Sequence, residues 1–113
     1  MLEVRGRRSG RTIKFPVVIA EVGAERYLVS MLGAEANWVL NLRAAGGRAV
    51  LRHGRRESVR LDEVPPGERA PILRRYLEVA PGARPHFPIF RSAPLAEFDR
   101  IATDYPVFRI RVS

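Results

Sequence analysis

A short basic segment near the start of the chain holds the side chains best suited to bind an anion. It reads Arg7-Arg8-Ser9-Gly10-Arg11, with Lys14 shortly after it. Guanidinium groups donate paired hydrogen bonds to phosphate or carboxylate, a hydroxyl adds a donor, and glycine lets backbone N–H groups approach an anion. The segment lacks the glycine spacing and the terminal Gly-Lys-Ser/Thr of a Walker loop. Because basic turns are also common on solvated surfaces, the pattern alone makes this segment a candidate and no more.

A second segment joins a predicted strand to a predicted helix. Ser30 and Gly33 stand in a flexible loop, and Trp38 and Asn41 follow on the helix. The free N–H groups and partial positive charge of a helix N-terminus form a natural seat for an anionic ligand group. An equally simple interpretation makes Trp38 a core anchor and Asn41 a polar residue on the helix surface. The pattern leaves both interpretations open.

The composition restricts the chemistry further. The 113 residues carry 20 Lys and Arg against 12 Asp and Glu, a net charge of +8, with no cysteine and two histidines. The absence of cysteine excludes a disulfide framework, a thiolate nucleophile and cysteine-ligated zinc, and it favours a reducing, cytoplasmic location. His53 and His86 are far apart in the sequence, so no metal site is expected.

The positive charge is concentrated in two stretches of the chain. Residues 1–14 hold five basic residues and one acidic residue, and residues 48–60 hold the same numbers. Charge this localised suggests an anionic partner such as a phosphorylated cofactor, nucleic acid or a membrane surface. No run approaches the roughly 20 apolar residues that a membrane span needs, and no apolar signal-peptide core follows the first charges. Neither a membrane span nor a secretory leader is therefore expected.

Hydrophobic periodicity and turn residues predict the elements that must position these side chains. The predicted strands cover residues 2–7, 14–22, 26–31, 48–53, 57–64 and 107–112, and the predicted helices cover residues 35–45, 68–79 and 95–102. The proline-rich residues 80–94 are predicted to form a loop. Hairpins dominate this order, which predicts an α+β fold. We expect one domain over residues 1–113, a small antiparallel β-barrel with helices packed on its outside.

Taken together, the two candidate segments resemble a known family. The motif G-R-R-S-G, the proline six residues after Gly10, and the later pattern S-x-x-G…W-x-x-N-L-x-A-x-G are similar to the deazaflavin-dependent nitroreductases of actinobacteria. The resemblance extends over nearly the whole chain, from about Val4 to Val112. It implies a split antiparallel β-barrel of the FMN-binding kind. It also implies an oxidoreductase that uses the 8-hydroxy-5-deazaflavin coenzyme F-420, with FMN as the alternative, to reduce a quinone, a nitro compound or a similar electrophile.

The same resemblance assigns roles to individual residues. The phosphate and acidic tail of the coenzyme would be held by Arg7, Arg8, Ser9, Gly10 and Arg11, with Lys14 beside them. The deazaflavin ring would lie beside Phe15, Pro16 and Val17. Ser30 and Gly33 would line the passage between ring and phosphate, and Trp38 and Asn41 would fix the helix that forms the other wall of the pocket.

Tyr105, just before the last predicted strand, has two interpretations. It could donate a proton to the reduced acceptor, as a C-terminal tyrosine does in some members of that family. Alternatively, its ring packs beneath the final strand and its hydroxyl bonds outward. His86 with Phe87 and Phe90 could similarly form a flap over the acceptor pocket, or simply cover one end of the barrel.

Two other functions stay open at this point. A coenzyme-binding relative without catalysis would carry or sequester a deazaflavin or flavin. A small basic β-barrel could instead bind nucleic acid, but that requires exposed aromatic residues interleaved with basic ones, and Phe15, Tyr27 and Phe108 stand singly among aliphatic neighbours. The favoured partner is a small-molecule electron acceptor rather than nucleic acid. A homodimer that completes the coenzyme cleft is compatible with the sequence.

Overall fold

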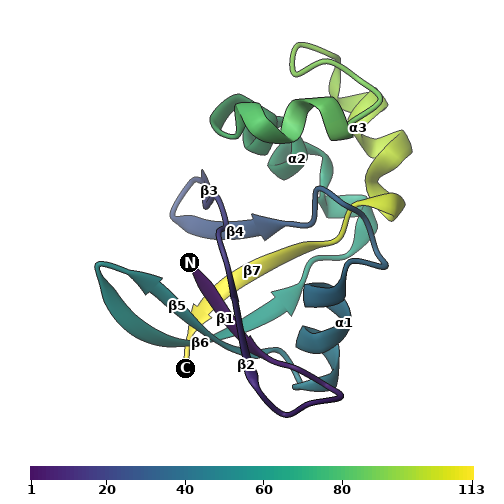
Figure 1. The fold of residues 1–113 in the computed structure, drawn as a ribbon. Coiled ribbons are helices and arrows are strands. Elements are labelled where there is room, and N and C mark those ends of the chain that lie inside the picture. Colours follow the sequence, from purple (N-terminus) through teal and green to yellow (C-terminus); the bar gives the residue numbers. More distant parts are fainter.

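The computed structural model describes every residue from Met1 to Ser113 (Figure 1). The strands are β1 (Leu2–Arg5), β2 (Thr12–Phe15), β3 (Ala20–Val22), β4 (Glu25–Val29), β5 (Arg48–His53), β6 (Arg55–Glu63) and β7 (Val107–Val112). The α-helices are α1 (Asn37–Ala44), α2 (Ala70–Val79) and α3 (Leu95–Ile101). Three short 3₁₀ helices are η1 (Pro66–Glu68), η2 (Pro81–His86) and η3 (Ala102–Asp104).

All the strands belong to one sheet, in the order β2-β1-β5-β6-β7-β4-β3. Every neighbouring pair is antiparallel, as hairpin connections require. Figure 1 shows the sheet curled into a half-open barrel, with α1 beside it and with α2 and α3 together beyond β3 and β4. The predicted α+β class and split antiparallel barrel are confirmed.

Two clusters of buried apolar side chains hold the curled sheet and the helices together. The first contains Phe108 and Ile110 of β7 and is closed by Leu42 of α1. The second packs α2 and α3 against residues that include Val107 of β7. Successive residues of a strand point to opposite faces of a sheet, so β7 contributes to both clusters in turn. The barrel interior and the helix-covered face are therefore separate hydrophobic layers.

Helix α2 has its apolar residues on one side, as its sequence predicts, and its start is fixed by Arg69. The buried Arg69 guanidinium donates from Nε to the Val64 carbonyl at 2.8 Å and from Nη1 to the Ala102 carbonyl at 2.9 Å. Desolvation by burial lowers the pKa of Arg69, and the Glu63 carboxylate at 3.2 Å opposes that shift. This clamp ties the start of α2 to the segments that follow β6 and α3.

The prediction of one continuous strand over residues 14–22 is wrong. Strand β2 ends at Phe15, and β3 begins only at Ala20. Pro16 has no N–H to donate to a ladder, and it restricts the backbone of the residue before it. Residues 16–19 therefore leave the sheet. The two halves of the predicted strand become β2 and β3, which lie at opposite edges of the sheet. That departure creates one wall of the candidate site.

Candidate functional site

The loop between β1 and β2 is closed by its own backbone. The Gly6 N–H donates to the Arg11 carbonyl at 2.7 Å, and the Gly10 N–H donates to the Gly6 carbonyl at 2.9 Å. A Cβ atom at Gly6 would lie 2.9 Å from the Ser9 Oγ, closer than side-chain packing allows. Gly10 has a φ of 73°, in the left-handed region that glycine adopts without strain. These glycines fold the arginines of the loop into a compact bend.

Asn41 fastens this loop to α1. Its Oδ1 accepts hydrogen bonds from the Arg7 backbone N–H at 3.1 Å and from the Arg7 Nη1 at 2.7 Å. Only 4% of Asn41 is exposed, so the interpretation of a surface polar residue is wrong. A buried amide oxygen that lost these donors would carry a desolvation cost. Asn41 thus fixes both the backbone and the guanidinium of Arg7.

Trp38 serves both as an anchor of the core and as a wall of the site. Its ring lies 5.5 Å from the ring of Phe15 and 5.5 Å from that of Phe108, measured between centroids. The contact with Phe108 is edge-on, a favoured aromatic geometry. Because Trp38 is only partly buried, the rest of its surface lines a hollow. The two interpretations of Trp38 are therefore compatible.

A cleft made of three adjoining hollows runs along α1. The apolar hollow, about 410 Å³, is lined by Phe15, Pro16, Val17, Val18, Val29, Met31, Leu32, Trp38, Tyr76, Val79, Ala80, Pro81, Gly82 and Ala83. The central hollow, about 560 Å³, is lined by Val4, Gly6, Arg7, Arg8, Ser9, Ile13, Phe15, Leu32, Ala36, Asn37, Trp38 and Asn41. The basic hollow, about 700 Å³, is lined by Arg5, Gly6, Arg7, Arg8, Ser9, Gly10, Asn41, Ala44, Ala45 and Arg48. Each hollow shares lining residues with the next, so the cleft is continuous.

The cleft changes in chemical character along its length. No charged side chain lines the apolar hollow. The basic hollow contains four arginines and no acidic residue: Arg5, Arg7, Arg8 and Arg48. None of these four belongs to an ion pair of the protein. The arrangement suits a ligand with an apolar ring at one end and negative charge at the other.

Most of the residues predicted for the site are brought together by the fold. The cleft is lined by Arg7, Arg8, Ser9, Gly10, Phe15, Pro16, Val17, Trp38 and Asn41. Arg11 and Lys14 are exposed and line none of the three hollows. The Arg11 backbone N–H donates to the Ser9 Oγ at 3.1 Å, and Lys14 stands opposite Glu3 in the β1–β2 pairing.

Ser30 and Gly33 act on the cleft indirectly. The buried Ser30 Oγ donates to the Gly33 carbonyl at 2.6 Å, and the Gly33 N–H donates to the Ser30 carbonyl at 3.2 Å. Gly33 has a φ of 95°, which allows this tight turn. Neither residue lines the cleft, but the turn presents Leu32, 65% exposed, to the apolar and central hollows. Their predicted place along the passage is thus taken by Leu32.

The fold does not bring Tyr105 to the cleft. Its hydroxyl donates to the His86 carbonyl at 2.7 Å, and its ring stacks on Phe87 with 4.1 Å between centroids. Tyr105 lines none of the three hollows, and its hydroxyl proton is already shared with a backbone carbonyl. This geometry matches the packing interpretation of Tyr105 rather than that of a proton donor. Desolvation, aided by the nearby Asp104 carboxylate, raises its pKa.

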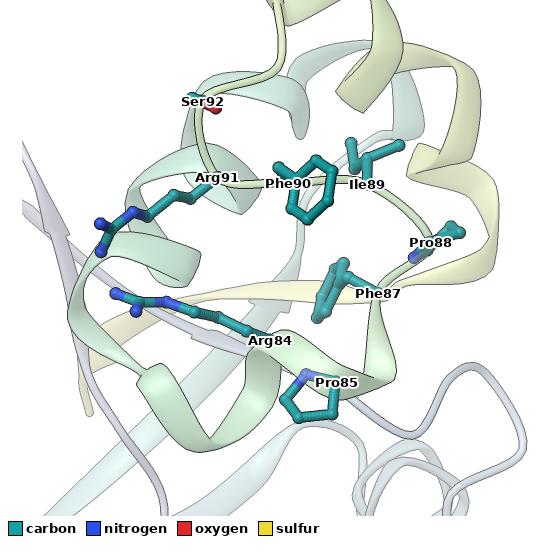
Figure 2. Close-up of a pocket in the computed structure, with 8 residues that line it drawn as sticks. All are labelled: Arg84, Pro85, Phe87, Pro88, Ile89, Phe90, Arg91 and Ser92. Atoms are coloured by element: carbon teal, nitrogen blue, oxygen red, sulfur yellow. The ribbon is translucent and has the colours of Figure 1, made fainter.

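The predicted flap does not cover the cleft either. Phe87 is buried, whereas Phe90 is 84% exposed on the loop between η2 and α3. Figure 2 shows Phe90 near a separate hollow of about 620 Å³, with Arg84 and Arg91 extending to the same side. The Arg84 Nε donates to the Leu77 carbonyl at 2.8 Å, at the end of α2. None of the residues of this hollow lines the cleft.

Tyr76 and Arg48 line the cleft although sequence reasoning did not place them there. Tyr76 lies on the apolar side of α2, a position typical of core, and is 5% exposed. Desolvation by burial raises the pKa of Tyr76 above its ordinary value of 10.0. Arg48 begins β5 and completes the basic hollow. The concentration of charge in residues 48–60 was a signal for Arg48, but no local pattern connected that stretch with the first basic segment.

None of the helices combines the length and the apolar character that a bilayer crossing requires. No group of three or more histidine or acidic side chains is placed to hold a metal ion. The cleft offers both an apolar wall and a cluster of cationic donors.

Comparison with known proteins identifies the family of the chain. The sequence profile of the F420H(2)-dependent quinone reductase family matches residues 1–85. That range contains every residue that lines the three hollows, from Val4 to Ala83. A comparison with curated proteins gave no match. The matched range covers most of the 113 residues, so the chain belongs to the F420H(2)-dependent quinone reductase family and is an oxidoreductase that uses the deazaflavin coenzyme.

Proposed function

We propose that this protein reduces a quinone, or a related electrophile such as a nitro compound, with a hydride from the reduced deazaflavin coenzyme bound in the cleft. The observation that carries this proposal is the continuous passage from an uncharged apolar hollow to a hollow with four arginines. The coenzyme has the same polarity, because its flat ring is joined to a phosphate and an acidic tail. The family match supports the same class of reaction.

The residues present fit the phosphate end of the coenzyme. Arg7 and Arg8 supply charge-assisted donors, and Asn41 holds the Arg7 guanidinium in place. At Gly6 a Cβ atom would meet the Ser9 hydroxyl, the Ile13 side chain and the Arg11 carbonyl, so glycine keeps the bend compact there. We assign the phosphate to this bend and the acidic tail to the arginines beyond it. Arg11 and Lys14 contribute only longer-range charge.

The residues of the apolar hollow fit the ring. Phe15 and Trp38 present aromatic surface, and Pro16 and Val17 continue the same wall. Such a wall orients a flat ring and excludes water from one side of it. When bound, the coenzyme supplies the hydride, so the protein has only to position the reactants and manage a proton.

Tyr76 is the side chain best placed to manage that proton. Reduction of a quinone to a hydroquinone consumes a hydride and a proton. Tyr76 lines the apolar hollow, and a phenol whose pKa is not below its ordinary value of 10.0 is protonated at neutral pH, so it has a proton to donate. We therefore assign to the Tyr76 Oη the role of proton donor that the sequence had suggested for Tyr105.

Two measurements test the proposal with the intact chain. Titration of the protein with the deazaflavin coenzyme, followed by coenzyme fluorescence, should show saturable binding. Mixing the protein loaded with reduced coenzyme with a stoichiometric quinone should then give single-turnover oxidation, followed by absorbance. Binding without turnover would favour a carrier of the coenzyme, and absence of binding would contradict the proposal as a whole.

A further inference from the structure

The outer face of the sheet carries a concentration of arginines that has no part in the cleft. Successive residues of a strand point to opposite faces, and the inward residues of β6 and β7, such as Val59, Leu61 and Ile110, are buried in the barrel interior. The residues between them point outward. Five outward residues of β5, β6 and β7 are arginines, and they are called the basic face below: Arg52, Arg56, Arg60, Arg109 and Arg111.

Arginines stand directly opposite one another across these strands. Arg52 of β5 stands opposite Arg56 of β6. Arg60 of β6 has an arginine on each side, Arg48 of β5 and Arg111 of β7. Like charges at directly opposed positions repel each other and destabilise a sheet. The fold thus retains three unfavourable pairs on one exposed face, and an anion from outside the chain would relieve all three.

The carboxylates of the chain do not neutralise the basic face. Glu3 is shared between Arg52 and Arg56, at 3.4 and 3.3 Å. Asp62 is shared between the two arginines of β7, at 3.9 and 2.9 Å. Arg60 belongs to no ion pair. Five arginines against two carboxylates leave an excess of three positive charges for an anionic partner.

The arginines form two rows whose separation resembles that of the phosphate chains of a duplex. Arg52 and Arg56 form one row across neighbouring strands, and Arg60 and Arg111 form the other. Arg56 and Arg60 are four residues apart on β6, which at the rise of a strand is roughly 13 Å. The major groove of B-DNA is about 12 Å wide. One row can therefore reach the phosphates on each side of a groove, with the Ser58 hydroxyl between the rows.

The shape of the basic face also favours a duplex. The sheet curls around the core on its other side, so the basic face is convex (Figure 1). A convex surface fits a groove, whereas a flat bilayer would meet few of these arginines at once. The aromatic residue beside the face, Tyr27 opposite Arg109, packs against the cluster under α2 and α3. Single strands bind by stacking their bases on exposed aromatic side chains, but the phosphates of a duplex need only cationic donors.

We propose that the basic face is a docking surface for double-stranded nucleic acid, bound through its phosphates without regard to sequence. The surface is separate from the coenzyme cleft, because none of its five arginines lines the three hollows. Its occupation depends on neither the coenzyme nor the electron acceptor.

A titration of the wild-type protein into a short, fluorescently labelled DNA duplex of mixed sequence, followed by anisotropy, tests the proposal. Binding should saturate, and the logarithm of the association constant should fall with the logarithm of the salt concentration with a slope of about −3, the value for three to four neutralised phosphates. A single strand of the same length and vesicles that contain an anionic phospholipid should both bind more weakly than the duplex.

Arg60→Glu should change duplex affinity and protein stability in opposite directions. A carboxylate between Arg48 and Arg111 replaces repulsion by attraction, so the variant should be at least as stable as the wild type to chemical denaturation. Its duplex affinity should fall at least tenfold, with a salt slope less steep by about one. Arg60→Gln should lie between the two proteins in affinity. Arg91→Glu, on the exposed loop between η2 and α3, changes the net charge equally and should keep the wild-type affinity within about twofold.

Three results would overturn the inference. They are a lack of saturable duplex binding by the wild-type protein, tighter binding of the single strand or of the anionic vesicles, and equal duplex affinities of Arg60→Glu and Arg91→Glu. The last result would show that the overall charge of the chain, and not the basic face, attracts the duplex.

Discussion

The two ends of the cleft are built in different ways. The basic end comes mainly from one bend and the helix that holds it, and its arginines are exposed to solvent. The apolar end is assembled from distant segments, including residues 15–18, Trp38 and residues 79–83. Its shape depends on the packing of α2. Arg69 fixes the start of this helix through its bonds to the Val64 and Ala102 carbonyls. Replacing an arginine at the basic end should therefore disturb the fold little. Replacing a side chain that lines the apolar end should disturb the fold as well as ligand binding.

This difference predicts that damage to the apolar end changes both stability and binding, whereas replacing the arginines of the basic end changes mainly binding. Buried aromatic contacts belong to the hydrophobic core, and their loss leaves a cavity. Exposed guanidinium groups without ion-pair partners contribute little to folding. Variants at the two ends should therefore separate in a plot of unfolding free energy against coenzyme affinity.

Replacing Trp38 with alanine should have the largest effect. The ring is packed between Phe15 and Phe108, and its removal should lower the free energy of unfolding by about 3 kcal/mol. Coenzyme binding should fall in parallel, since the wall of the apolar hollow is lost. Chemical denaturation and fluorescence titration of the same preparation measure the two effects. Unchanged stability would show that Trp38 is a ligand contact and not a core residue.

Tyr76→Phe should separate catalysis from binding at the apolar end. Loss of the hydroxyl should lower the single-turnover rate with a quinone by about 100-fold, the scale of general acid catalysis, with the coenzyme dissociation constant unchanged. In the wild-type protein, the raised pKa of Tyr76 should keep the rate level through neutral pH and let it fall only above pH 10.0. Tyr105→Phe is the matched control and should leave the rate unaltered.

The free energy of unfolding should also depend on the ionisation of the Tyr76 phenol. The pKa of the Tyr76 phenol is higher in the folded chain than in the unfolded chain. Its contribution to stability is then complete below pH 10.0 and is lost as the pH rises through the folded-state value. The free energies of unfolding of wild type and Tyr76→Phe should depend on pH in the same way near neutral pH. In strong alkali, the free energy of unfolding of the wild type should fall more steeply than that of Tyr76→Phe. The same slope of unfolding free energy against alkaline pH in both proteins would contradict a raised pKa of Tyr76 in the folded chain.

Replacing Arg7 and Arg8 together with alanine should raise the coenzyme dissociation constant at least tenfold, on the order of 1.4 kcal/mol, because charge-assisted pairs are lost. The free energy of unfolding should fall by no more than about 1 kcal/mol, because the buried Asn41 Oδ1 loses the Arg7 guanidinium but keeps the Arg7 backbone N–H as a donor. Arg55→Ala and Arg74→Ala, at arginines outside the cleft and without ion-pair partners, control for net charge. An unaltered titration curve for the double variant would mean that the bend does not hold the phosphate.

Replacing Asn41 should have the smallest effect, and it should change both the free energy of unfolding and the coenzyme affinity. Asn41→Ala frees Arg7 and should lower the free energy of unfolding by about 1 kcal/mol while weakening coenzyme binding severalfold. Asn41→Asp keeps an acceptor for Arg7, so it should retain more stability, but its charge should weaken binding further. Equal affinity of the two variants would argue against an electrostatic role for this end of the cleft.

Much of the basic end could be predicted from the sequence because Arg7, Arg8, Ser9 and Gly10 are consecutive in the chain, whereas Arg48 joins them only through the fold. The motif around Gly10 and the helix with Trp38 and Asn41 meet in the structure as expected. At the apolar end, Phe15, Pro16, Val17 and Trp38 were predicted, but Tyr76 was not, because it reaches the cleft through tertiary packing and carries the same local pattern as a core residue. Pro16 was recognised within the predicted strand 14–22. The break between β2 and β3 could not be predicted, because it depends on which strands β2 and β3 pair with. The choice between the two interpretations of Tyr105 could not be made from the sequence, because its hydroxyl donates to a backbone carbonyl, at His86, that no sequence pattern marks.

A crystal structure of the protein with the deazaflavin coenzyme bound would test the division of the cleft most directly. The phosphate should lie within hydrogen-bonding distance of Arg7 and Arg8, with the ring against Trp38 in the apolar hollow. A coenzyme seated instead in the hollow beside Arg84 and Phe90, or with its ring among the arginines, would contradict it.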